Sequence, residues 1–126
     1  MRFRFFPLVA ALAALILFTA CSGNQRLRYS SAEEAYEKGM LEFRNEDYQT
    51  AVKFFRGVFQ YGRGNDYAED AQFRIAEAYE KQRRYLLAAA EYQRFAKLYA
   101  GSQRVPVAEY RRARMYYLSS PMYQLD

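Results

Sequence analysis

Residues 35–55 read AYEKGMLEFRNEDYQTAVKFF, and residues 72–92 read QFRIAEAYEKQRRYLLAAAEY. The two stretches match in residue type at a spacing of 37 residues, in the pairs Tyr36/Phe73, Gly39/Ala76, Tyr48/Tyr85, Ala51/Ala88 and Phe55/Tyr92. A further step of 37 residues places Tyr110, Ala113 and Tyr116 below Phe73, Ala76 and Tyr79. A repeat of about 34 residues is typical of helix-turn-helix solenoids. The pattern therefore predicts an all-α chain of repeated helical hairpins.

Helix signals along the chain agree with that prediction. Apolar residues recur at helical spacing, and no stretch alternates with a period of two. Ser31-Ala32-Glu33-Glu34 has the form of a capping box, and Asp66-Tyr67-Ala68-Glu69 repeats it. Turn residues or charge pairs interrupt the pattern near residues 45–47, 62–65, 83–84, 101–102 and 119–121. We expect five helices of about 14 residues each.

The small residues of the repeat predict where helices approach each other closely. Gly39, Ala76 and Ala113 are expected where one helix crosses its partner, with Ala51 and Ala88 as the reciprocal contacts. This order of small and aromatic residues resembles the tetratricopeptide repeat. The resemblance implies a short right-handed solenoid of about two and a half repeats. The repeats would span residues 31–65 and 66–102, followed by the first helix of a third repeat within residues 103–126.

The N-terminal residues 1–20 have the features of an export signal. Two arginines within residues 1–4 precede an apolar run of 16 residues, from Phe5 to Ala20, that holds no charge. The run is shorter than the roughly 20 residues of a membrane-spanning helix, which is the weaker interpretation. Cys21 follows directly, and the stretch 17–21, LFTAC, resembles a bacterial lipobox. The resemblance implies a lipid-modified N-terminus at Cys21 followed by a flexible tether, residues 21–30. An ordinary signal peptide with a free thiol is the alternative.

Composition removes most enzyme classes. The 126 residues include no histidine and one cysteine, so a Ser-His-Asp triad, a Cys/His zinc site and an internal disulfide have no residues to form them. Glu77 and Glu80 could form a carboxylate pair, but we expect them to be solvated charges on a helix surface. The sequence therefore predicts a protein that is not an enzyme, with no catalytic residues, cofactor or metal site.

With the lipobox and the repeats both present, the chain resembles the BamD family, the repeat lipoproteins of outer-membrane β-barrel assembly. The resemblance rests on Cys21 and on the stretches AYEKG (35–39), DYQTA (47–51), FAKLY (95–99) and RMYYLSSPMYQLD (114–126). The resemblance implies a scaffold lipoprotein, anchored in the outer membrane and facing the periplasm. Its partners would be other subunits of the assembly complex and unfolded outer-membrane protein segments. A periplasmic repeat adaptor in cell-wall synthesis or cell division is the alternative.

The third repeat lacks a second helix, which bears on its apolar residues. The BamD family has about five repeats, so this chain is expected to be the front part of a longer protein. A solenoid unit buries its apolar face only against neighbours. We therefore expect an uncovered face on the last helix, made of Tyr110, Ala113, Met115, Tyr116, Tyr117 and Leu118.

First helices line the inner surface of a tetratricopeptide array and provide the candidate binding site. Aromatic and soft side chains there suit extended peptides with apolar anchors. The candidate peptide-binding residues are Tyr36, Met40, Phe43, Phe73, Tyr110, Arg114 and Tyr117. For Phe43 and Phe73 the alternative is that they pack the core between repeats. Within the repeats, Ala88 is expected to be buried and Glu91 exposed.

Charge is uneven along the chain. Net charge is +5 overall, yet residues 83–114 hold eight basic and two acidic side chains. This basic stretch could bind anionic lipid or an acidic partner segment, or could consist of ordinary solvated helix faces. An export signal argues against a nucleic-acid surface, so no nucleic acid is expected among the partners.

Overall fold

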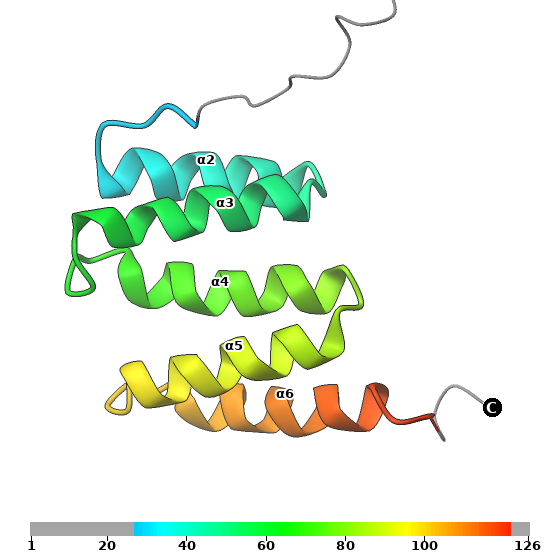
Figure 1. The fold of residues 1–126 in the computed structure, drawn as a ribbon. Helices are drawn as coiled ribbons and strands as arrows, with labels where there is room; N and C mark the ends of the chain where they lie inside the picture. Colours follow the sequence, from blue (N-terminus) through cyan, green and yellow to red (C-terminus); the bar gives the residue numbers. More distant parts are fainter. Residues whose placement is uncertain (1–26, 122–126) are drawn as a thin grey trace, which may run out of the picture.

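The computed structural model describes residues 27–121, which leaves Cys21 and the export signal outside the described residues. Within that range the chain forms only helices, connected by short loops. Figure 1 shows them stacked in chain order, each running antiparallel to the next. The helices are α2 (Ala32–Arg44), α3 (Tyr48–Val58), a 3-10 turn η1 (Phe59–Tyr61), α4 (Ala68–Lys81), α5 (Tyr85–Leu98) and α6 (Val105–Leu118). The predicted all-α fold is confirmed, and its sequential hairpins are consistent with tetratricopeptide-like repeats.

The turns inside the two hairpins repeat at the same spacing as the sequence. Glu46 ends the α2–α3 turn with a φ of 63°, and Arg83, 37 residues later, takes a φ of 57° in the α4–α5 turn. Each is followed by a residue whose N–H reaches back to a carbonyl five residues earlier. Non-glycine residues adopt this left-handed conformation at a cost of about 1 kcal/mol or more. Two such turns in register therefore support one hairpin unit used twice.

The start of α2 confirms the first predicted cap. Ser31 Oγ accepts from the Glu34 N–H at 3.0 Å. The Glu34 carboxylate accepts from the N–H and the hydroxyl of Ser30, at 2.6 and 2.7 Å, one residue before the usual partner in a capping box. The hydrogen bond from Lys38, followed by those from Ser30, lowers the pKa of Glu34 to about 2.

The second predicted cap, at Asp66, is wrong. Helix α4 has Tyr67 as its N-cap residue, with no side-chain hydrogen bond to the helix start. The preceding loop is organised by Asn65, whose Oδ1 accepts from the Tyr67 N–H at 3.0 Å and whose Nδ2 donates to the Val58 carbonyl at 3.1 Å. An asparagine turn has thus replaced the capping box, because its amide can both donate and accept.

The core lies between the helices and follows the repeat pattern. Ala51, Ala76 and Ala88 are fully buried, as their predicted crossing positions require, and Phe55 is fully buried beside them. Ala113, also predicted at a crossing, is exposed on α6. A methyl group built on Gly39 would lie 2.6 Å from two ring carbons of Phe55, so the ring occupies the space that a side chain would need. Close approach of α2 and α3 therefore depends on this glycine.

Replacing Gly39 by alanine should destabilise the fold by about 1 to 3 kcal/mol, because the added methyl overpacks a buried ring. The gain in helix propensity, up to about 1 kcal/mol, offsets part of that loss. Gly101→Ala is the matched control, since nothing lies within 4 Å of its added methyl. Urea denaturation of both variants measures the difference. Equal midpoints would mean that the α2–α3 contact is looser than described.

Three predicted exposures differ from the structure. Glu91, expected at the surface, is 8% exposed and accepts from Gln72 Nε2 at 2.8 Å. Met115, expected to be uncovered, is fully buried, and Leu118 is half-buried. All three corrections follow from helix packing, which a single repeat register does not reveal. Helix α5 lies between α4 and α6 and turns more than one face inward, while α6 packs on α5, which covers one of its faces.

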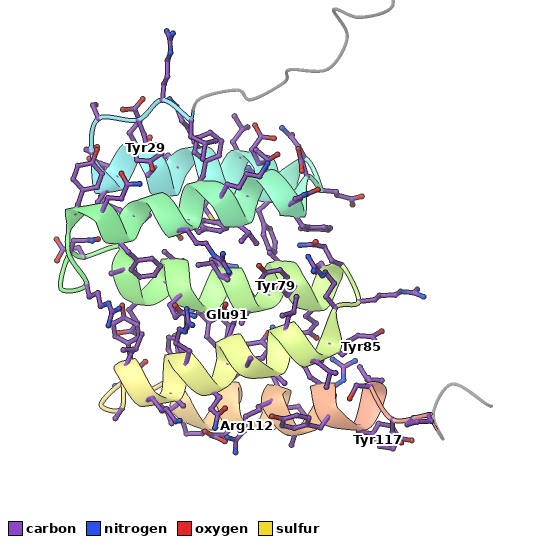
Figure 2. The ribbon with its side chains drawn as sticks, in the orientation of Figure 1. Tyr29, Tyr79, Tyr85, Glu91, Arg112 and Tyr117 are labelled. Atoms are coloured by element: carbon purple, nitrogen blue, oxygen red, sulfur yellow. The ribbon has the colours of Figure 1, made fainter. Side chains whose placement is uncertain are left out.

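The segment before α2 is docked on the first hairpin. The ring of Tyr29, labelled in Figure 2, lies 6.2 Å from Phe54 and 6.4 Å from Tyr61, measured between ring centres. A methyl on Gly57 would lie 2.5 Å from the Tyr29 ring, so the ring packs here only because residue 57 is a glycine. Tyr29, which falls in the stretch expected to be a tether, is therefore packed on the first hairpin.

Candidate functional site

Helices α2, α4 and α6 form one surface, which we call the inner surface. They are joined by side-chain bonds at a constant spacing of 34 residues: Tyr36 to Asp70, Asp70 to Arg104, Glu77 to Arg111 and Glu80 to Arg114. This spacing is one helical turn less than the repeat of 37, so each bond crosses from one first helix to the next. The inner surface is therefore held together by polar contacts.

Asp70 lies at the centre of the first half of this network. The Tyr36 hydroxyl and the Arg104 guanidinium both donate to its carboxylate, and Arg74 Nε lies 3.2 Å away. Burial raises the pKa of Asp70, but the bonds from Tyr36 and Arg104 and the nearby Arg74 outweigh burial, so the pKa lies below its usual value. Asp70 is thus an ionised link between α2 and α6.

Glu77 and Glu80 form the second half, and the expectation that they are solvated is wrong. Their side chains are 15% and 18% exposed. Arg111 Nη1 donates to Glu77 at 2.8 Å and to the Tyr92 hydroxyl at 3.1 Å, while Tyr92 donates to Glu80 at 2.7 Å. Burial, with Glu80 contributing, raises the pKa of Tyr92 above its ordinary value. The two carboxylates are used to join helices.

The α2 side of the inner surface carries an apolar stripe bordered by charged side chains. Tyr36, Met40 and Leu41 line a cleft of about 580 Å³ together with Glu37, Lys38 and Arg44, and Leu41 is 48% exposed. Phe43, one turn further along the same face, borders a second cleft of about 430 Å³. An apolar stripe on α2 therefore lies beside the ion-paired region of α4 and α6.

The structure brings some of the predicted peptide-binding residues together and separates others. Tyr36, Met40 and Phe43 share the α2 stripe, and Tyr110 and Arg114 line the Phe43 cleft. Phe73 is 4% exposed, packs its ring against Tyr92 and Phe95, and lies under the Arg104 guanidinium at 4.1 Å. This is the core-packing alternative for Phe73. Tyr117 is 66% exposed at the end of α6 (Figure 2).

Several residues of the inner surface were missed. Leu41, Arg74 and Arg111 contribute to the clefts but stood in no motif. Opposite charges at the spacing of 34 residues, as in Glu77 and Arg111, were the available signal. A search at the repeat period alone passes over them.

The basic stretch at residues 83–114 is largely neutralised. Five of its eight cations form ion pairs with carboxylates: Arg94, Arg104, Arg111, Arg112 and Arg114. The net charge of a segment therefore overstates the charge that its surface presents.

Residues 27–121 contain neither a candidate metal centre nor a helix that could span a bilayer. No cluster of three or more acidic or cysteine side chains in that part could hold a metal ion. No helix among the described residues has the length and apolar character needed to cross a bilayer.

One comparison with known proteins gives a match. A family model described as "YfiO: Outer membrane lipoprotein" matches residues 28–123, which is most of the chain and all but one residue of its described part. No curated protein matches this chain significantly.

Proposed function

The chain belongs to the YfiO outer membrane lipoprotein family, and from that premise we propose that it is a non-enzymatic scaffold of outer-membrane β-barrel assembly. Its repeats would be residues 31–65, residues 66–102 and a third unit beginning at residue 103. Its partners would be other subunits of the assembly complex and unfolded outer-membrane protein segments. Family membership favours this role over the cell-wall adaptor.

The apolar stripe on α2 is the observation that carries the proposal. The carboxylates and arginines of α4 and α6 are already paired with each other, so they offer little to a new ligand. Met40 and Leu41 give the α2 cleft its apolar part, and Glu37, Lys38 and Arg44 complete its lining. A barrel strand alternates apolar and polar residues, so an extended strand segment can place apolar side chains there and keep polar ones outward.

Binding of an extended peptide tests this role. The probe is a fluorescein-labelled peptide of alternating aromatic and polar residues, added to residues 21–126. Met40→Ala with Leu41→Ala should weaken binding about tenfold, or about 1.4 kcal/mol. The reason is that truncating two apolar side chains reduces the apolar area that the peptide can bury. We avoid Tyr36 because it also bonds to Asp70.

Leu86→Ala with Leu87→Ala is the matched control. Both leucines are exposed, at 63% and 41%, on α5 and outside the inner surface. Fluorescence anisotropy should give unchanged affinity for the control. Equal losses in both double variants would remove the α2 stripe from the mechanism.

We further propose that the mature chain is lipid-anchored at Cys21 and faces the periplasm from the outer membrane. Cys21→Ala should release the protein into the soluble periplasmic fraction and abolish labelling by a fatty-acid probe, because the acyl chains provide the membrane affinity. Fractionation of cells expressing both forms measures this. Membrane retention of the wild type without any label would argue against the anchor.

A further inference from the structure

A groove runs between α3 and α5 across α4, which is the one helix it shares with the inner surface. It consists of two clefts, of about 550 and 200 Å³. Arg56 lies in the wall of both, so the clefts adjoin. Tyr79 and Glu91, both labelled in Figure 2, belong to its lining. We call this feature the basic groove.

The lining of the basic groove carries an excess of positive charge. Arg56, Arg63 and Arg94 line the larger cleft, and the smaller one adds Lys53 and Arg84. The acidic lining residue among the described side chains is Glu91. Five cations against one carboxylate leave a charge of +4 in a confined space, where attraction for an anion is strongest.

Tyr79 contacts two of these cations: its hydroxyl accepts from Arg56 Nη2 at 3.1 Å, and its ring centre lies 5.5 Å from the Arg84 guanidinium. The ion pairs of the groove are looser. Arg56 and Arg94 lie 3.5 and 3.7 Å from Glu91, at or beyond the limit of a hydrogen bond, and their side chains are 55% and 61% exposed. The arginine ties on the inner surface are tighter, with Arg111 at 2.8 Å from Glu77. Exposed, stretched ion pairs contribute little stability. Arg94 can therefore turn toward a ligand without disturbing the fold, and Arg56 can do so by giving up one hydrogen bond to Tyr79.

The shape and floor of the groove indicate the class of ligand. Glu91 is buried and bound by Gln72, so a ligand cannot displace it at low cost. Ile75 and Leu98 give the larger cleft an apolar part. A flat bilayer surface cannot enter a groove between two helices, whereas an extended chain can. Such a chain would need carboxylates for the walls and some apolar side chains for the floor.

We propose that the basic groove is a second interaction surface, which binds an extended acidic segment of a partner protein. It shares no element of the inner surface except α4, so the two surfaces can be occupied together. The proposal goes beyond the role of the α2 stripe, and either can fail without the other. Two of its cations, Arg84 and Arg94, belong to the basic stretch at residues 83–114, and Lys53, Arg56 and Arg63 lie outside that stretch.

The test uses residues 21–126 and a fluorescein-labelled octapeptide, Glu-Glu-Leu-Glu-Glu-Leu-Glu-Glu. Arg63→Gln with Arg94→Gln should weaken its binding about tenfold, and affinity should fall steeply as salt rises because exposed charges are screened. Arg28→Gln with Lys97→Gln is the control, since it removes the same charge from two exposed positions outside the groove. Thermal melting of both variants checks that they fold.

Each other outcome overturns the proposal. Equal weakening by the two double variants would mean attraction by net charge alone. Unchanged binding of a peptide with glutamine in place of glutamate would mean that charge is not recognised. Binding to phosphatidylglycerol vesicles that depends on Arg63 and Arg94, without binding of the acidic peptide, would make the occupant a membrane surface. No peptide binding in low salt would also contradict it.

Discussion

Phe55→Ala is expected to lower the free energy of unfolding by about 3 to 5 kcal/mol, the usual loss for truncating a buried phenylalanine. Phe55 is fully buried in the first hairpin. Its ring centre lies 5.8 Å from that of Tyr36 and 6.4 Å from that of Phe43, and it fills the space left by Gly39. Removal would leave a cavity lined by rigid rings on helices that cannot easily close in.

Leu86→Ala is the control for this loss. Leu86 is 63% exposed, so its truncation should change stability by no more than about 0.5 kcal/mol. Urea denaturation followed by circular dichroism measures both variants. Small domains have total stabilities of about 5 to 15 kcal/mol, so the Phe55 variant should be partly unfolded in mild denaturant. A midpoint like that of the Leu86 variant would show that the first hairpin is not the centre of the core.

The helices could be predicted because their signals are local. Periodicity and turn residues place a helix without knowledge of its neighbours. The repeat also identified Ala51 and Ala88 as crossing positions, because two copies of one hairpin must bury equivalent residues. The break at residues 83–84 was predicted, but the positive φ of Arg83 was not, since an arginine in that conformation has no sequence signature.

Side-chain partners were harder to predict because they depend on neighbouring helices. Glu91 reads as a surface residue on α5 until Gln72 of α4 is placed beside it. From the sequence alone Glu77 is expected to be solvated, whereas in the structure it accepts a hydrogen bond from Arg111 of α6. A polar residue is buried only where a partner satisfies it, and that partner lies 19 or 34 residues away in these cases. The ion pairs of the inner surface therefore could not be predicted from the sequence and are known only from the structure.

The last helix leads to the other large expected effect. Its Tyr110 and Ala113 are equivalent to Phe73 and Ala76, and Phe73 of α4 packs against two rings of α5. On α6 the equivalent face is open: Tyr110 is 69% and Tyr116 51% exposed. Residues 21–126 should therefore bind a hydrophobic dye strongly and self-associate with rising concentration, because a contiguous apolar face on a helix favours association.

Tyr110→Ser with Tyr116→Ser should abolish dye binding and give a monomer by analytical ultracentrifugation, because each substitution removes an aromatic ring from that face. Leu86→Ser with Leu87→Ser is the control, because it removes exposed apolar area from α5 and should leave the association of α6 intact. Met115 stays in place because it is fully buried and supports the contact of α6 with the core. A wild type that is monomeric and binds no dye would mean that the exposed face of α6 is too polar to drive association. Equal effects of the two double variants would assign the dye signal to general hydrophobicity, and α6 would then lose its part in assembly.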